Sequence, residues 1–290
     1  MEGWTGVAGK RVLVTGATHG IGLAAARELA KRGAELAIVA RDAARGEAAA
    51  CQIAAAGGTA HADVLHADLT SQRDIHELAR EALRRYPRID VLINNAGAVF
   101  GRRSVTVDGI ETTWALNHLA PFLLTALLLG RLKESAPARI VTTTSDAHKN
   151  HTIPFDDINA ERGYRARGFT RYGETKLANI LFTRELARRI RGTGVTANCV
   201  HPGLVASGFN RNNGALMSFG MLLVRPFARS PRRGADGLVW LADAPAVGAQ
   251  SGGYFEDRRL ATPSKPAQDD EAAARLWGVS EEQTHQLVSG

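Results

Sequence analysis

The sequence predicts a single α/β domain in which a doubly wound, mostly parallel sheet of seven strands carries helices on both faces. Short runs rich in β-branched residues alternate with helix-like stretches across a core at residues 10–255, a pattern typical of sheets built from βαβ units. The chain has 290 residues, 44% of them hydrophobic, so it can bury a large core. No internal repeat, low-complexity tract or linker interrupts the pattern, so we expect one domain over residues 1–290.

The first βαβ unit contains a glycine turn suited to a dinucleotide. An apolar run at 11–15 leads into the turn, a helical stretch at 23–31 follows, and a second run lies at 35–40. Glycines let the backbone approach a pyrophosphate, and the helix N-terminus supplies unpaired N–H groups. The spacing is Gly-x-x-x-Gly-x-Gly; a structural turn without ligand is the alternative. This unit predicts a Rossmann-type domain with cofactor contacts at Gly16, Thr18, His19, Gly20, Ile21 and Gly22.

The residue that ends the second strand bears on the choice of cofactor. An acid there would bind the ribose 2′-hydroxyl of NAD, whereas an arginine would pair with the 2′-phosphate of NADP. This chain has Arg41, and His19 adds a second polar group on the glycine turn. Asp42 follows directly and offers the alternative of a ribose contact. The sequence therefore favours NADP(H), with NAD(H) as the alternative.

Two further strands end in residues that we expect near the cofactor. A run at 60–66 leads to Asp68 and Leu69, where Asp68 either contacts the adenine or begins a helix at 71–86 capped by Thr70 or Ser71. Ligands of open α/β sheets bind outside the carboxyl ends of the strands. The run at 89–93 ends in small residues and amides that allow close approach, although a simple turn is the alternative. The candidates after that run are Asn95, Ala96 and Gly97.

Tyr172 and Lys176 form the candidate acid/base pair. Their spacing of four places both side chains on one face of a helix predicted to run through about Ile190. A free phenol has a pKa near 10, and a neighbouring cation would lower that pKa toward a useful value. Taken alone, the same spacing also fits an exposed pair on a solvated face.

Several motifs in one order resemble the short-chain dehydrogenase/reductase family over residues 10–255. They are Thr15-Gly16-x-x-x-Gly20-Ile21-Gly22, Asn94-Asn95-Ala96-Gly97, Asn117, Ser145, Tyr172-x-x-x-Lys176 and Pro202-Gly203. The segments Val39-Ala-Arg41-Asp42, Leu116-Asn117-His118-Leu119 and Tyr172-Gly-Glu-Thr-Lys-Leu-Ala-Asn are similar to the retinol dehydrogenase-like branch. Relatives in that branch often carry an N-terminal membrane anchor, and residues 1–10 show none, so retinoid activity does not follow.

The resemblance implies roles for four residues. Tyr172 would be the acid/base, and Lys176 would lower the pKa of Tyr172 and hold the nicotinamide ribose. Ser145 would bind the substrate oxygen, and Asn117 would fix a water that links Lys176 to solvent. Gly173 and Thr175 replace serines that are common near this tyrosine. Further cofactor contacts are implied at Pro202, Gly203, Val205 and Ser207.

Composition limits the partners and the compartment. The net charge is +7, but the arginines are scattered and accompany no nucleic-acid motif, so we expect no nucleic-acid partner. Two cysteines indicate a reducing compartment. The longest apolar run, at 119–129, contains Pro121 and is short for a membrane span. We therefore expect a cytoplasmic protein without an integral membrane segment, and a homodimer or homotetramer is possible.

The substrate is expected to be a small lipophilic carbonyl or alcohol. Residues 204–231 carry many apolar side chains and would form a lid, with core packing or a subunit contact as the alternative. His148 and His151 lack a third ligand, so no metal is predicted. A helical tail at 266–290 would pack on the pocket or on a second subunit. The predicted activity is an NADP(H)-dependent oxidoreductase; the alternatives are an NAD-dependent alcohol dehydrogenase and a non-catalytic dinucleotide sensor or scaffold.

Overall fold

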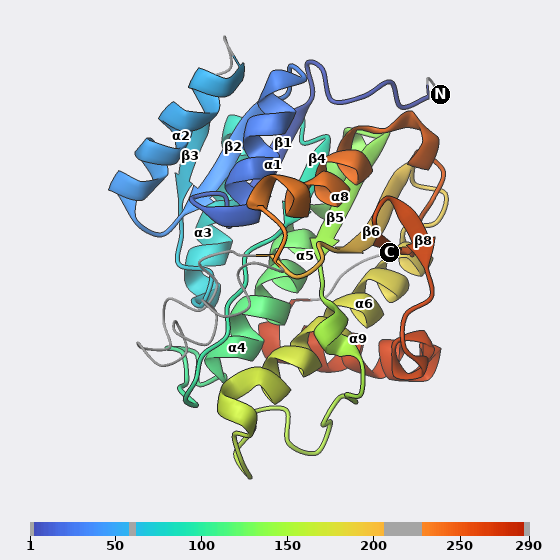
Figure 1. Ribbon diagram of the computed structural model, residues 1–290. Helices are drawn as coiled ribbons and strands as arrows, with labels where there is room; N and C mark the ends of the chain where they lie inside the picture. The colour runs from blue at the N-terminus through green and yellow to red at the C-terminus, as the bar shows by residue number, and fades with distance from the viewer. Residues whose placement is uncertain (1–2, 58–61, 206–227, 287–290) are drawn as a thin grey trace.

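The computed structural model describes residues 3–57, 62–205 and 228–286 (Figure 1). Among these residues the strands form one sheet, and every neighbouring pair is parallel except the last. In spatial order the strands are β3 (Asp63–His66), β2 (Glu35–Ala40), β1 (Arg11–Thr15), β4 (Val91–Asn94), β5 (Ala138–Thr143), β6 (Val195–His201), β7 (Tyr254–Glu256) and β8 (Arg259–Ala261). The order reverses between β1 and β4, which is the switch point of a doubly wound sheet.

The sheet has eight strands in the described residues, one more than the seven predicted. The additional strand, β8, pairs antiparallel with β7 through a turn at Asp257 and Arg258. Both turn residues have positive φ, at 47° and 61°, where glycine or asparagine is usual. The prediction missed this hairpin because neither its turn nor its three-residue strand carries the usual sequence pattern.

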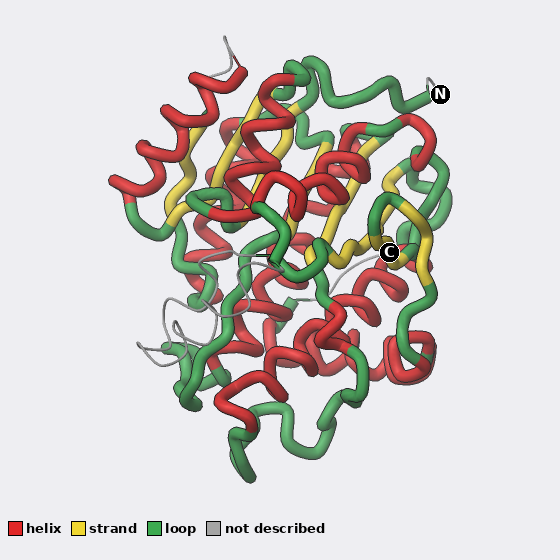
Figure 2. The backbone as a smooth tube through the Cα atoms, viewed as in Figure 1, coloured by secondary structure: helices red, strands yellow, loops and turns green. Residues whose placement is uncertain are grey.

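Helices cover both faces of the sheet, as predicted (Figure 2). Alternate residues of β1 point to opposite faces: Val12 and Val14 lie in one core and Leu13 in the other. The first core is closed by α1 (Gly20–Lys31), α2 (Ala43–Gly57) and α8 (Pro231–Asp243). The second is closed by α3 (Gln72–Arg85), α5 (Ala120–Glu134) and α6 (Phe169–Arg189).

The C-terminal tail forms the helix α9 (Asp270–Thr284), which packs on α6. Trp277 of α9 stacks on Phe182, with ring centroids 6.0 Å apart, and meets Phe122 edge-on at 5.0 Å. The Ser280 hydroxyl lies 2.9 Å from Nε2 of His118. The tail is therefore part of the core on the α6 side.

The segment Thr112–Glu134 forms a continuous helix that passes through Pro121 near the start of α5. Its length and composition would allow it to cross a membrane, with a mean hydropathy of 1.4. However, 72% of its apolar window is buried inside the fold, as in the core helix of a globular domain. Proline did not break the helix, because it follows the π-helical turn Ala115–Leu119, and the Asn117 carbonyl that lacks its N–H partner accepts from the Asn179 side chain at 2.9 Å instead.

A buried ion pair joins the two helical segments that lead to the candidate catalytic residues. The Arg171 guanidinium lies 2.8 Å from the Glu111 carboxylate, and their side chains are 2% and 0% exposed. Glu111 also accepts hydrogen bonds from the backbone N–H groups of Thr113 and Trp114 at the start of α4 (Thr112–Trp114). Arg171 lies over the Trp114 ring at 4.6 Å.

Removing one partner of the Arg171–Glu111 pair should lower the stability of the fold, because the charge of the other partner stays buried without compensation. We expect Arg171→Met to lower the free energy of unfolding by roughly 3–5 kcal/mol, measured by urea denaturation at pH 7. Arg162→Met is the matched control, because Arg162 pairs with Asp156 at the surface, and it should produce no measurable change. Equal losses in the two variants would contradict the assignment of the buried pair as a structural element.

Candidate active site

The glycine turn between β1 and α1 leaves no room for side chains at two positions. Gly16 has a φ of 67°, and a Cβ atom there would lie 2.8 Å from the Ala96 Cα. A Cβ atom on Gly22 would lie 2.2 Å from the Gly16 carbonyl oxygen. The α1 helix begins at Gly20 without a side-chain cap from His19. The exposed backbone of this turn and the start of the helix dipole fit a pyrophosphate.

Thr15 and Asn95 join the ends of three strands beside this turn. The Thr15 hydroxyl accepts hydrogen bonds from the backbone N–H groups of Asn95 and Ala96, at 3.0 and 3.1 Å. The Asn95 amide donates to the carbonyls of Thr15 and Gly16, both at 3.2 Å, and accepts from Thr143 of β5. The Asn95 side chain therefore fixes the turn, and its predicted contact with the cofactor stays a prediction.

Arg41 and Asp42 have different environments at the end of β2. The Asp42 carboxylate accepts a hydrogen bond from the Arg45 backbone N–H at 2.8 Å and so caps α2. The Arg41 side chain is 73% exposed, and its closest carboxylate oxygen, on Asp68, lies 3.7 Å away. The Arg41 guanidinium is therefore available for an anion, whereas Asp42 is engaged in its own helix.

Asp68 and Leu69 begin the connection from β3 to α3. The Asp68 carboxylate accepts from the backbone N–H and the hydroxyl of Thr70, at 2.9 and 2.8 Å. Ser71 caps α3 by accepting from the Asp74 backbone N–H, as one of the two predicted caps. Leu69 is 9% exposed. These bonds satisfy one Asp68 oxygen, and the other faces Arg41.

Tyr172 and Lys176 share one face of α6, at the carboxyl edge of the sheet. The Lys176 ammonium lies 5.3 Å from the centroid of the Tyr172 ring. Lys176 is 3% exposed and donates to the Thr143 carbonyl at 3.1 Å. Ser145, just beyond β5, acts on the Tyr172 phenol by lowering its pKa against the rise that burial causes. Three of the four predicted catalytic side chains are thus brought together.

Asn117 completes the group from a π-helical turn at Ala115–Leu119, a feature that is frequent at functional sites. Its amide oxygen accepts from the Ala98 backbone N–H, and its amide nitrogen donates to the Ala98 carbonyl, both at 2.9 Å. The amide also donates to the Thr175 hydroxyl at 3.1 Å. A Cβ atom on Gly97 would lie 3.2 Å from the Asn117 oxygen and 3.4 Å from the Lys176 ammonium. Asn117, Gly97 and Lys176 are therefore closely packed.

Burial dominates the ionisation of the pair. It raises the pKa of Tyr172, and the hydrogen bond from Ser145 offsets the rise only in part. Burial lowers the pKa of Lys176 to about 8. The pKa of Tyr172 lies above its ordinary value because burial disfavours the phenolate. The lowering of this pKa by Lys176 stays a prediction. At pH 7 the pair consists of a neutral phenol beside an ammonium.

Gly173, which replaces a common serine, is required by the packing of His151. A Cβ atom on Gly173 would lie 2.3 Å from the His151 ring and 2.5 Å from the Ala147 carbonyl. The other replacement, Thr175, keeps a hydroxyl group, which accepts a hydrogen bond from the Asn117 amide. Neither departure disturbs the catalytic group.

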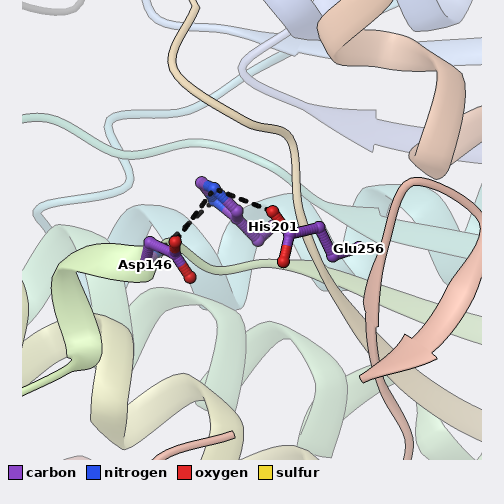
Figure 3. Close-up of side chains that lie close together, drawn as sticks. All are labelled: Asp146, His201 and Glu256. Carbon is purple, nitrogen blue, oxygen red and sulfur yellow. Dashed lines mark hydrogen bonds and ion pairs between the residues drawn. The ribbon is translucent and has the colours of Figure 1, made fainter. Parts of the chain in front are cut away.

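Asp146, His201 and Glu256 form a cluster that sequence analysis missed (Figure 3). Nε2 of His201 lies 3.8 Å from Asp146 and 4.0 Å from Glu256. Nδ1 of His201 accepts the Asp146 backbone N–H at 3.2 Å, so the neutral ring carries its proton on Nε2. A metal at Nε2 would displace that proton while Nδ1 still faces an N–H group, so the geometry favours a cluster of polar side chains over a metal site. Burial lowers the pKa of His201, and the two acids oppose the shift.

The segment after β6 is fixed by Arg229. Gly203 has a φ of 79°, and a Cβ atom there would lie 2.7 Å from the Arg229 side chain. Arg229 binds the Asp257 carboxylate at 2.9 Å, and its backbone forms a bridge with Val205. Pro202, Gly203 and Val205 thus follow β6 to the same edge as Ser145. Ser207 lies outside the described residues, as do residues 206–227 of the predicted lid at 204–231.

The family model for short chain dehydrogenases matches residues 10–216. The chain belongs to the short-chain dehydrogenase family. Its relatives also bear out the resemblance to the retinol dehydrogenase-like branch. This short-chain dehydrogenase is 45% identical to mouse retinol dehydrogenase 12, over 94% of this chain and 86% of that protein. It is 43% identical to a Streptomyces protein provisionally named daunorubicin C-13 ketoreductase DnrU, over 95% and 92% of the two chains.

Solved structures agree with the fold. A Mycobacterium paratuberculosis protein of uncharacterised function superimposes with a TM-score of 0.78 and 31% identity, over 99% of both chains. A Pseudomonas aeruginosa RhlG/NADP active-site complex has a TM-score of 0.70 and 28% identity, over 88% of this chain and 97% of that one. The short-chain dehydrogenase therefore acts on a small molecule and uses a nicotinamide dinucleotide.

The low pKa of Lys176 implies that its charge destabilises the fold. The unfolded chain binds the proton more tightly, so the penalty is full below pH 8 and disappears as the pH rises to 10.5. We expect Lys176→Met to raise the free energy of unfolding at pH 7 by about 3 kcal/mol, with a smaller difference at pH 10. Urea denaturation checks this, with Lys31→Met at the surface as the control. A less stable Lys176→Met at pH 7 would show that the bond to Thr143 outweighs burial.

Proposed function

We propose that the protein interconverts a carbonyl and an alcohol on a lipophilic substrate with NADP(H), and that Tyr172 is the acid/base. The convergence of Tyr172, Lys176, Ser145 and Asn117 at the carboxyl edge of the sheet carries this proposal. NADPH, when bound, supplies the hydride. The glycine turn and the uncapped start of α1 fit its pyrophosphate.

The side chains have complementary roles. The neutral Tyr172 phenol donates its proton to the carbonyl oxygen during reduction and accepts it back during oxidation. Ser145 hydrogen-bonds the substrate oxygen and stabilises the charge that develops on it. The Lys176 ammonium holds the nicotinamide ribose and lowers the energy of the phenolate once the proton has left. Asn117 fixes a water that links Lys176 to solvent.

NADP(H) is favoured over NAD(H) because of the environments at the end of β2. Asp42 caps α2, which weakens it as a ribose ligand, while Arg41 presents an exposed guanidinium. A structural relative was solved as an NADP complex. An NADP preference favours reduction in the cell.

Reversing the charge at Arg41 should reverse the preference. We expect Arg41→Asp to weaken NADPH binding about 10- to 100-fold, because a charge-assisted bond to the phosphate is lost, and to leave NADH as the tighter ligand. Fluorescence titration measures both constants. Arg84→Asp is the control, because Arg84 is exposed in the last turn of α3. Equal affinities for NADPH and NADH in the unmodified protein would refute the role of Arg41.

A lipophilic substrate is supported by the names of the relatives. One is named for retinol, which is largely hydrocarbon, and another for the C-13 ketone of daunorubicin. We also propose that the protein lies in the cytoplasm and forms a homo-oligomer. An alternative is a dinucleotide sensor without turnover, but a pure binder has no use for the catalytic group.

Removing the Tyr172 hydroxyl should abolish turnover without affecting the cofactor. We expect Tyr172→Phe to lower kcat at least 100-fold, since acid/base catalysis contributes about 10²–10⁴, with unchanged NADPH affinity. NADPH absorbance is followed over a panel of apolar aldehydes, ketones and quinones. Tyr86→Phe is the matched control; it removes a phenol that binds Asp63. Wild-type turnover by Tyr172→Phe on any accepted substrate would refute the assignment.

A further inference from the structure

The turn that carries Ser145 is held in place from three directions. His201 accepts the Asp146 backbone N–H, and the Tyr254 hydroxyl donates to the Asp146 carboxylate at 3.0 Å. The third contact is His148, whose Nδ1 lies 2.8 Å from the Ser145 carbonyl. His148 is completely buried, and its ring meets the Tyr254 ring edge-on at 5.3 Å. Two of these contacts come from β6 and β7, and His148, which belongs to the turn itself, connects it to Ser264 in the C-terminal part of the chain.

The partners of His148 allow one arrangement of its protons. The Ser145 carbonyl can only accept, so Nδ1 carries the proton and donates. Nε2 lies 3.1 Å from the Ser264 backbone N–H, which can only donate, so Nε2 is the acceptor. A neutral imidazole supplies one donor and one acceptor in this way, and a charged or flipped ring would not.

Hydrogen bonds therefore link the C-terminal segment to Ser145. They run from Ser264 through the His148 ring to the Ser145 carbonyl, and the Ser145 side chain lowers the Tyr172 pKa against the rise that burial causes. The backbone N–H of His148 also donates to the Ser145 carbonyl, at 3.1 Å. The backbone bond alone is therefore enough to close the turn. The imidazole ring adds a bond that fixes the orientation of the turn relative to Ser264.

We propose that His148 is a positioning residue, which orients Ser145 toward Tyr172 by anchoring the Ser145 carbonyl to the C-terminal segment. This proposal rests on the proposed function, in which Ser145 binds the substrate oxygen. The backbone at Ser145 is extended, with φ −160° and ψ 154°, and a rotation there would move the hydroxyl away from the phenol. Small displacements of catalytic groups are costly: about 1 Å can reduce a rate about 100-fold.

Two substitutions test the roles of the two ring nitrogens separately. His148→Asn places an amide nitrogen near Nδ1, so it keeps a donor for Ser145 and loses the acceptor for Ser264. His148→Gln reaches the position of Nε2, so its amide oxygen accepts from Ser264, but nothing donates to Ser145. We expect His148→Asn to retain kcat within about threefold and His148→Gln to lose about 10- to 100-fold. KM and the NADPH dissociation constant should stay the same in both.

Stability and a tail control distinguish positioning from folding. Each variant loses one hydrogen bond, so urea denaturation should give similar losses in both, while only kcat separates them. Asp270→Asn removes a contact of α9 with Arg184 at the surface and should leave kcat unchanged. Nitrogen NMR of labelled protein should show His148 with its proton on Nδ1.

Four outcomes would overturn the proposal. If both His148 variants lose kcat equally and in proportion to their loss of stability, then His148 has a role in folding only. Wild-type kcat in His148→Gln, or a proton on Nε2 in the NMR spectrum, would remove the positioning role while the proposed function stands. Absence of NADPH turnover by the unmodified protein on the whole carbonyl panel would remove both.

Discussion

The parallel register of β1, β4, β5 and β6 is the constraint on which the site depends. Parallel strands end at the same edge, so Thr15, Asn95, Ser145 and Pro202 meet there although they are far apart in sequence. Thr15 and Asn95 then join the strand ends by hydrogen bonds across β1, β4 and β5. Because these bonds use the Asn95 side chain completely, the approach to a cofactor is left to backbone groups and glycines.

Burial sets the chemistry of the catalytic pair more than the charge of its neighbours. A buried ammonium is poorly solvated, which lowers the Lys176 pKa, and the same environment raises that of Tyr172. Both shifts favour the state with fewer charges. In the proposed mechanism, the Lys176 ammonium would offset part of the desolvation cost when negative charge develops on a neighbouring oxygen.

Sequence predicted well what depends on local pattern. Strand periodicity, the glycine turn and the spacing of Tyr172 and Lys176 gave the sheet, the α6 face and the edge where the site lies. Prediction from the sequence failed where a property depends on how deeply a group is buried or on partners that are distant in the sequence. The turn at Asp257 and Arg258 has no sequence pattern for a hairpin, so β8 was missed. The pKa of Tyr172 depends on burial, which four-residue spacing does not reveal. The roles assigned to Arg41 and the segment at 206–227 stay predictions.

Histidines explain how a polar site is fixed inside an apolar fold. His118, His148 and His201 lie one to three residues from Asn117, Ser145 and Pro202, and all three are buried. Burial lowers the pKa of each, to about 3 for His118. A neutral imidazole can join an N–H to a carbonyl without bringing a charge into the core. A lysine or a carboxylate at His148 would instead be charged or leave one partner unsatisfied, at a cost of about 1–3 kcal/mol. The requirement for one donor and one acceptor on a rigid ring therefore accounts for histidine at this position.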